Sequence, residues 1–98
     1  MKIEEFRVSI RNGELPSELS TALIALWFDA IGDWTAAHDQ LHDAVDSDSD
    51  WVHAYLHRKE GDLANAAYWY RRASRKVFKG SLKQEWNEMV TEFLTSTK

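Results

Sequence analysis

The sequence predicts an all-α protein with two stacked antiparallel helical hairpins, an N-terminal segment and a C-terminal capping helix. Three observations favour this fold class: apolar residues recur at spacings of three and four, Gly-Asp pairs separate the helical stretches, and the chain has one proline. Its 98 residues, 44% of them hydrophobic, suffice for one modest core. We therefore expect a single domain over residues 1–98.

The first eleven residues fit two patterns. Ile3, Phe6 and Ile10 have the spacing of a helix, whereas Phe6, Val8 and Ile10 have that of a strand. We favour a helix because every following segment is predicted to be helical.

The first hairpin is predicted after Ser17, where an apolar stripe with helical spacing begins. Gly32 is expected to end this helix, and Asp33 to cap the next one. The apolar positions of the two helices are Leu19, Ala22, Leu23, Leu26, Trp27, Ala30 and Ile31, then Trp34, Ala37, Leu41, Ala44 and Val45.

The second hairpin follows the polar run 46–50, which reads as a turn, so that the third helix begins at Trp51 and ends at Gly61. Asp62 is expected to cap the fourth helix. Its inward positions are Leu63, Ala66, Ala67, Tyr70, Ala73 and Val77.

Ser81 and Gln84 form a capping box for the last helix, whose apolar face contains Leu82, Trp86, Met89, Val90, Phe93 and Leu94.

Composition argues against several classes of function. The chain has no cysteine, which excludes disulfides and thiolate sites. It has no glycine-rich phosphate loop and no nucleophile motif, so we expect neither an enzyme nor a cofactor. The N-terminus has acids where a secretory signal would be apolar, and no apolar run reaches the roughly 18 residues of a membrane span. We therefore expect a soluble cytoplasmic protein with no membrane partner.

Charge is unevenly distributed along the chain. Residues 12–57 contain nine acids and no Lys or Arg, whereas residues 58–79 contain seven bases and two acids. The acidic part would repel a phosphate polymer, so nucleic acid is not the expected partner. Head-to-tail association or docking of an acidic partner is favoured instead.

The four histidines form two pairs with a spacing of four. His38 and His42 share one face of the second helix, and His53 and His57 share one face of the third, with Glu60 on the same side. In an antiparallel arrangement His38 lies level with His57, and His42 level with His53. Three or four of these groups could bind a divalent metal. The alternatives are a hydrogen-bonded polar seam between the helices or a pocket for a small polar ligand.

Aromatic and basic residues mark a candidate interaction surface on the fourth helix and after it. Trp, Tyr and Arg carry much of the contact energy of protein interfaces. The candidates are Asn65, Tyr68, Trp69, Arg72, Arg75 and Lys76. The alternative is that the last helix folds back and covers Trp69.

The chain also repeats itself. GDWTAAHDQLHDAV at Gly32 and GDLANAAYWYRRAS at Gly61 share Gly-Asp, a small Ala, a bulky residue and a later Ala. This pattern, over Ser17 to Ala73, resembles the second half of a tetratricopeptide repeat, which implies stacked helical hairpins. The Gly-Asp pairs are 29 residues apart, against about 34 in that family, and no proline closes either repeat. The phrase WVHAYLHRKEGDLANAAYWYRRA also looks like a small group of uncharacterised bacterial proteins.

Two functions remain after these exclusions. The first is a non-catalytic protein-interaction module that binds a protein partner or a second copy of itself, as a homodimer. The second is a metal- or small-ligand-binding protein that uses the histidines between two helices.

Overall fold

The computed structural model describes residues 1–95, which form six helices and no strand. The all-α prediction is therefore confirmed, and the N-terminal segment is helical. No helix in this part of the chain has the length and apolar character needed to cross a membrane. The helices are α1 (Ile3–Asn12), α2 (Thr21–Ala30), α3 (Trp34–Gln40), α4 (Ser47–Glu60), α5 (Leu63–Arg72) and α6 (Leu82–Thr95).

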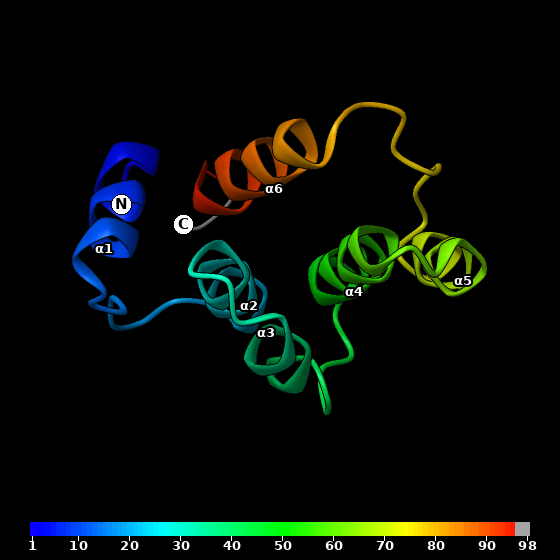
Figure 1. Ribbon diagram of the computed structural model, residues 1–98, viewed down its shortest axis with the longest axis horizontal. Helices are drawn as coiled ribbons and strands as arrows, with labels where there is room; N and C mark the ends of the chain where they lie inside the picture. Colours follow the sequence, from blue (N-terminus) through cyan, green and yellow to red (C-terminus); the bar gives the residue numbers. More distant parts are fainter. Residues whose placement is uncertain (96–98) are drawn as a thin grey trace.

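Consecutive helices pack in pairs, α2 on α3 and α4 on α5, and α2 also contacts α4 (Figure 1). Helix α6 lies across α2 and α4, and α1 packs beside α6. Helix α4 is thus surrounded by α2, α5 and α6, which explains why every residue from Ser49 to His57 is buried. A helix buried on all sides must find partners for its polar side chains within the protein.

Side-chain caps fix where the helices begin. The predicted caps Asp33, Asp62 and Ser81 are confirmed, because each accepts a hydrogen bond from the backbone N–H three residues later. Two beginnings differ from the prediction. Helix α2 starts after Ser20 rather than Ser17, because Glu18 has a φ of 62° and cannot be helical. Helix α4 starts at Ser47, four residues before Trp51, because Asp46 rather than a later aspartate caps it.

The ends of two helices also differ from the prediction. Helix α3 stops at Gln40, and α5 stops at Arg72 because Ser74 adopts a left-handed φ of 58°. Val45 and Val77 therefore lie in connecting segments and are 87% and 46% exposed, not inward as expected. Leu63, at the start of α5, is also exposed.

Two buried carboxylates join the helices. Glu85 of α6 is fully buried and accepts hydrogen bonds from Trp51 Nε1 (2.9 Å), Tyr70 hydroxyl (2.5 Å) and Arg58 Nη1 (2.7 Å). Asp29 of α2 similarly accepts from the Tyr55 hydroxyl and the Lys59 ammonium, at 2.7 Å each. Burial raises the pKa of both tyrosines, so they remain hydrogen-bond donors. These contacts fix α4, and with it the histidines described next.

Candidate metal centre

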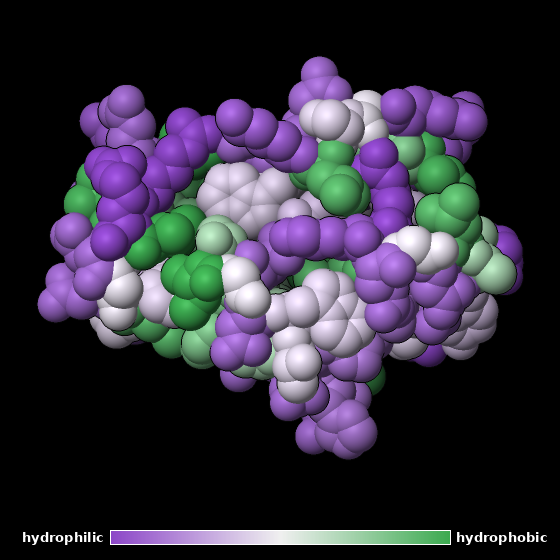
Figure 2. Space-filling model, viewed as in Figure 1, coloured by the Kyte–Doolittle hydropathy of each residue, from purple (hydrophilic) through white to green (hydrophobic). Residues whose placement is uncertain are grey.

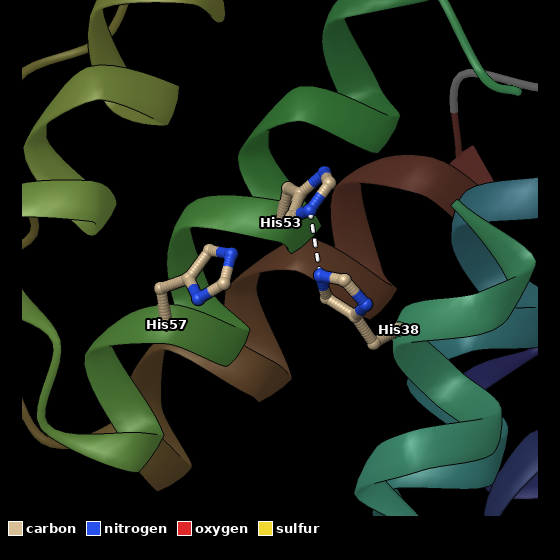
Figure 3. Close-up of side chains that lie close together, drawn as sticks. All are labelled: His38, His53 and His57. Atoms are coloured by element: carbon tan, nitrogen blue, oxygen red, sulfur yellow. Dashed lines mark hydrogen bonds between the residues drawn. The ribbon is translucent and has the colours of Figure 1, made fainter. Parts of the chain in front are cut away.

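Three of the four histidines meet between α3 and α4 (Figure 3). His38 projects from α3, while His53 and His57 project from successive turns of α4. The His38 ring centroid lies 4.7 Å from that of His53 and 5.3 Å from that of His57, and the two α4 rings are 5.1 Å apart. The i, i+4 spacing places the α4 pair on one face, and the α3–α4 contact adds the third ring.

The ring nitrogens converge on a common volume. Nε2 of His38 and Nε2 of His53 are 2.9 Å apart. Nδ1 of His57 lies 2.6 Å from Glu60 Oε1, and Figure 3 shows its other ring nitrogen facing the two remaining rings. One nitrogen from each ring lies within 4.8 Å of the other two. Zinc–nitrogen bonds of about 2.0–2.1 Å in a tetrahedral site require separations of about 3.3 Å, so small ring movements would accommodate an ion.

Glu60 determines the tautomer of His57. A carboxylate can only accept a hydrogen bond, so Nδ1 carries a proton, and in the neutral imidazole Nε2 then carries the lone pair. Metal-binding histidines commonly make this hydrogen bond to a carboxylate through the nitrogen that does not bind the metal. The Nε2 atom is 3.4 Å from Asn65 Nδ2, a long and weak hydrogen bond. Nε2 of His57 is therefore available to a better partner.

Two indole rings hold the imidazoles in place. Trp34 stacks on His38 with centroids 4.9 Å apart, and Trp69 stacks on His53 at 3.8 Å. Trp34 is itself fixed by a hydrogen bond from Nε1 to the Leu56 carbonyl. The stacking limits ring rotation and excludes water, since His53 is only 9% exposed.

Burial keeps two of the three imidazoles uncharged. It lowers the pKa of His53 to about 4, helped by the neighbouring His38, His57 and Arg72. Burial and His57 also lower the pKa of His38. Two of the three imidazoles are therefore neutral at pH 7 and need lose no proton to bind a metal. One of the Nε2 atoms of the His38–His53 hydrogen bond carries a proton, and metal binding would move that proton to Nδ1 of the same ring.

The structure separates the predicted ligands into two groups. His38, His53 and His57 come together, and Glu60 supports them. His42 does not: its side chain is 86% exposed, and its ion-pair partner is Asp43 at 3.9 Å. The prediction that it lies level with His53 is wrong, because α3 ends at Gln40 and the chain turns before the next helical turn could form.

The predicted interaction surface is also divided. Asn65 and Trp69 belong to the histidine site, and Tyr68 and Arg72 form its outer edge, with the Arg72 guanidinium 4.9 Å from the Trp69 ring. Trp69 is covered by His53, while α6 packs on other helices. The remaining two residues, Arg75 and Lys76, lie away from the histidines and together line two grooves at the segment between α5 and α6.

Sequence reasoning missed one member of the site. Trp34 was expected only as a packing residue, yet it stacks on His38 with an interplanar angle of 8°. The i, i+4 relation between Trp34 and His38 is the signal that could have identified the pair.

Comparison with protein-family models gave no match, and comparisons with curated proteins and with solved structures gave no significant match. The resemblance to tetratricopeptide repeats and to uncharacterised bacterial proteins therefore stays a prediction. The function is argued from the geometry of the histidine cluster.

Proposed function

We propose that this protein binds a divalent transition-metal ion, with zinc as the expected ion, through Nε2 of His38, His53 and His57. The observation that carries the proposal is the convergence of three ring nitrogens within 4.8 Å, one of them oriented by a carboxylate. Imidazole nitrogen suits zinc, copper, nickel and cobalt rather than magnesium or calcium. Three protein ligands leave a fourth position open in a tetrahedral site.

A purely structural polar seam explains part of this arrangement. It accounts for the hydrogen bond between His38 and His53, which satisfies both Nε2 atoms. A polar seam accounts less well for Nε2 of His57. This residue is buried, and among the described residues the hydrogen-bond partner of its Nε2 is the Asn65 amide at 3.4 Å. A buried acceptor with so weak a partner is unfavourable for stability. An ion bound by all three rings would remove that deficit.

The metal would also strengthen the small contact between α3 and α4. Helix α3 contacts α4 much less extensively than it contacts α2, and His38 is its contribution to the cluster. An ion that binds only the folded state stabilises it by about 2.7 kcal/mol when its free concentration is 100 times the dissociation constant. We therefore expect the melting temperature to rise when metal is added.

The decisive experiment is titration of tag-free, chelator-stripped protein with Zn²⁺, Co²⁺ and Ni²⁺ by calorimetry. We expect one ion per chain, a higher melting temperature, and the intense visible absorption of tetrahedral cobalt. His38→Ala and His53→Ala should abolish binding.

His42→Ala is the matched control, because it removes an exposed imidazole from the turn that follows α3. It should leave affinity unchanged. Circular dichroism with chelator present establishes that each variant folds. Absence of saturable binding, or an equal loss in the His42 variant, would refute the metal site and leave the polar seam.

A further inference from the structure

The fold neutralises only part of the basic segment at residues 58–79. Four of its seven cations lie against carboxylates of the same molecule. These pairs are Arg58–Glu85, Lys59–Asp29 and Arg75–Glu92 at 2.7 Å, and Arg72–Asp50 at 3.8 Å. The other three, Arg71, Lys76 and Lys79, are exposed and have no ion pair among residues 1–95. The unbalanced positive charge is therefore confined to the end of α5 and the segment after it.

These three cations surround a groove of about 410 Å³. Ala67, Tyr70 and Val77 provide its apolar lining, and Arg75 completes the basic edge. Val77 is 46% exposed, so a ligand or partner in the groove would cover apolar surface. The groove suits a partner that carries both an apolar group and negative charge.

The turn between α3 and α4 has this chemistry. Val45 is 87% exposed, the highest value among the large apolar residues that the structure describes. Asp43 precedes it with a side chain that is 97% exposed, and Asp46 follows it. An exposed valine between two aspartates is complementary to an apolar groove edged by cations.

The two segments that carry the turn and the groove lie on different sides of α4. In Figure 1 the connection between α3 and α4 lies at the bottom of the view, and the connection between α5 and α6 at the upper right, on the other side of α4. One molecule cannot place its own turn in its own groove. Figure 2 shows mainly hydrophilic side chains on the face turned towards the viewer, with apolar groups in small separate patches.

We propose that the 43–46 turn of one chain docks in the Arg71–Lys79 groove of a second copy. Val45 contacts Ala67 and Val77, and the aspartates pair with the basic edge. Because the two surfaces differ, the contact is heterologous and extends into head-to-tail chains or rings rather than ending at a symmetric dimer. The interface is small, so the dissociation constant should be roughly micromolar or weaker and should rise with salt. This contact does not involve His38, His53 or His57 and does not depend on metal.

Sedimentation equilibrium with chelator present tests the proposal. The average mass of the wild-type protein should increase with concentration, and moderate salt should reduce it. Two variants each lose one half of the contact: Asp43→Asn with Val45→Asn alters the turn, and Lys76→Gln with Lys79→Gln alters the groove.

Each variant alone should remain monomeric. An equimolar mixture should form a one-to-one heterodimer and nothing larger, because one variant retains the groove and the other the turn. Leu63→Asn, which replaces another exposed apolar residue, is the control and should associate like the wild type. A monomeric wild type, or a mixture without heterodimer, would overturn the proposal.

Discussion

Helix α4 contributes to two buried polar clusters with opposite chemistry. On one side, three donors from Trp51, Tyr70 and Arg58 converge on the carboxylate of Glu85. On the other side, imidazole nitrogens converge on one another. The first cluster is complete, because donors face an acceptor that carries the matching charge. In the second, three ring nitrogens lie within 4.8 Å of one another, and we propose that a cation completes it.

A structural polar cluster and a binding site differ in how well their buried polar groups are hydrogen-bonded. Both clusters are buried, and no buried side-chain nitrogen or oxygen of the described residues lacks a hydrogen-bond partner. What differs is bond quality: the contacts of Glu85 are 2.5–2.9 Å long, whereas Nε2 of His57 has a partner at 3.4 Å. We therefore expect changes at Glu85 to affect folding, and changes at the histidines to affect metal affinity.

The largest expected effect is on folding when Glu85 loses its charge. Glu85→Gln removes the partner of the Arg58 guanidinium and directs an amide donor at groups that are themselves donors. Breaking a buried ion pair costs about 3–5 kcal/mol, which is a large part of the stability of a small domain. Urea denaturation followed by circular dichroism measures the loss.

The matched control is Glu92→Gln, because Glu92 lies on the same helix as Glu85 and makes a half-exposed ion pair with Arg75. It should cost less than about 1 kcal/mol. Equal losses in the two variants would show that the Glu85 cluster is not the structural centre described above.

The two clusters also differ in how far the sequence could predict them. Helical periodicity is a local property, so it correctly placed His53 and His57 on one face and identified the caps Asp33 and Asp62. The Glu85 cluster was not predicted, because its donors lie 15 to 34 residues away in sequence on other elements. Only tertiary packing brings them together.

The start of α4 was missed for a related reason. Ser49 and Asp50 belong to a polar run that reads as a turn, yet both are buried in the first turns of the helix. A local pattern does not choose among the several capping residues of this run, of which Asp46 is the cap, and it cannot show that Arg72 of α5 approaches Asp50. The same limit applies to His42, whose position depends on where α3 ends.

The next effect is a loss of stability in acid for the metal-free protein. His53 has a pKa of about 4 when folded and about 6.5 when unfolded. Between these values the unfolded chain binds a proton that the folded chain does not. Stability is therefore complete above about pH 6.5 and decreases as the pH falls towards 4, by about 3 kcal/mol for a shift of about 2.5 units. The lowered pKa of His38 acts in the same direction.

Urea denaturation at pH 7 and pH 4.5, with chelator, measures this loss. Carboxylates also titrate over the range, so the informative quantity is the difference from His53→Phe, which retains an aromatic ring against Trp69. That variant should lose less stability between the two pH values. Identical pH profiles would mean that His53 is not neutral in the folded protein.

The smallest effect is on metal affinity and concerns Glu60, which contacts His57 without belonging to the three-nitrogen cluster. Glu60→Gln retains a hydrogen-bond acceptor but removes the charge that makes the imidazole a stronger ligand. Losing such a supporting carboxylate typically lowers metal affinity 10–100-fold. Glu60 is the last residue of α4, where a negative charge opposes the helix dipole. The metal-free stability should therefore change by less than about 1 kcal/mol.

Asp39→Asn is the charge-matched control, because Asp39 also acts electrostatically on His38 but makes no hydrogen bond to a histidine ring among the described contacts. Calorimetric titration with zinc should show weaker binding for the Glu60 variant and near-normal binding for the Asp39 variant. If both lose affinity equally, the effect of Glu60 is general electrostatics, and its hydrogen bond does not orient His57 for the metal. If neither loses affinity, the hydrogen bond between His57 and Glu60 does not contribute to metal binding.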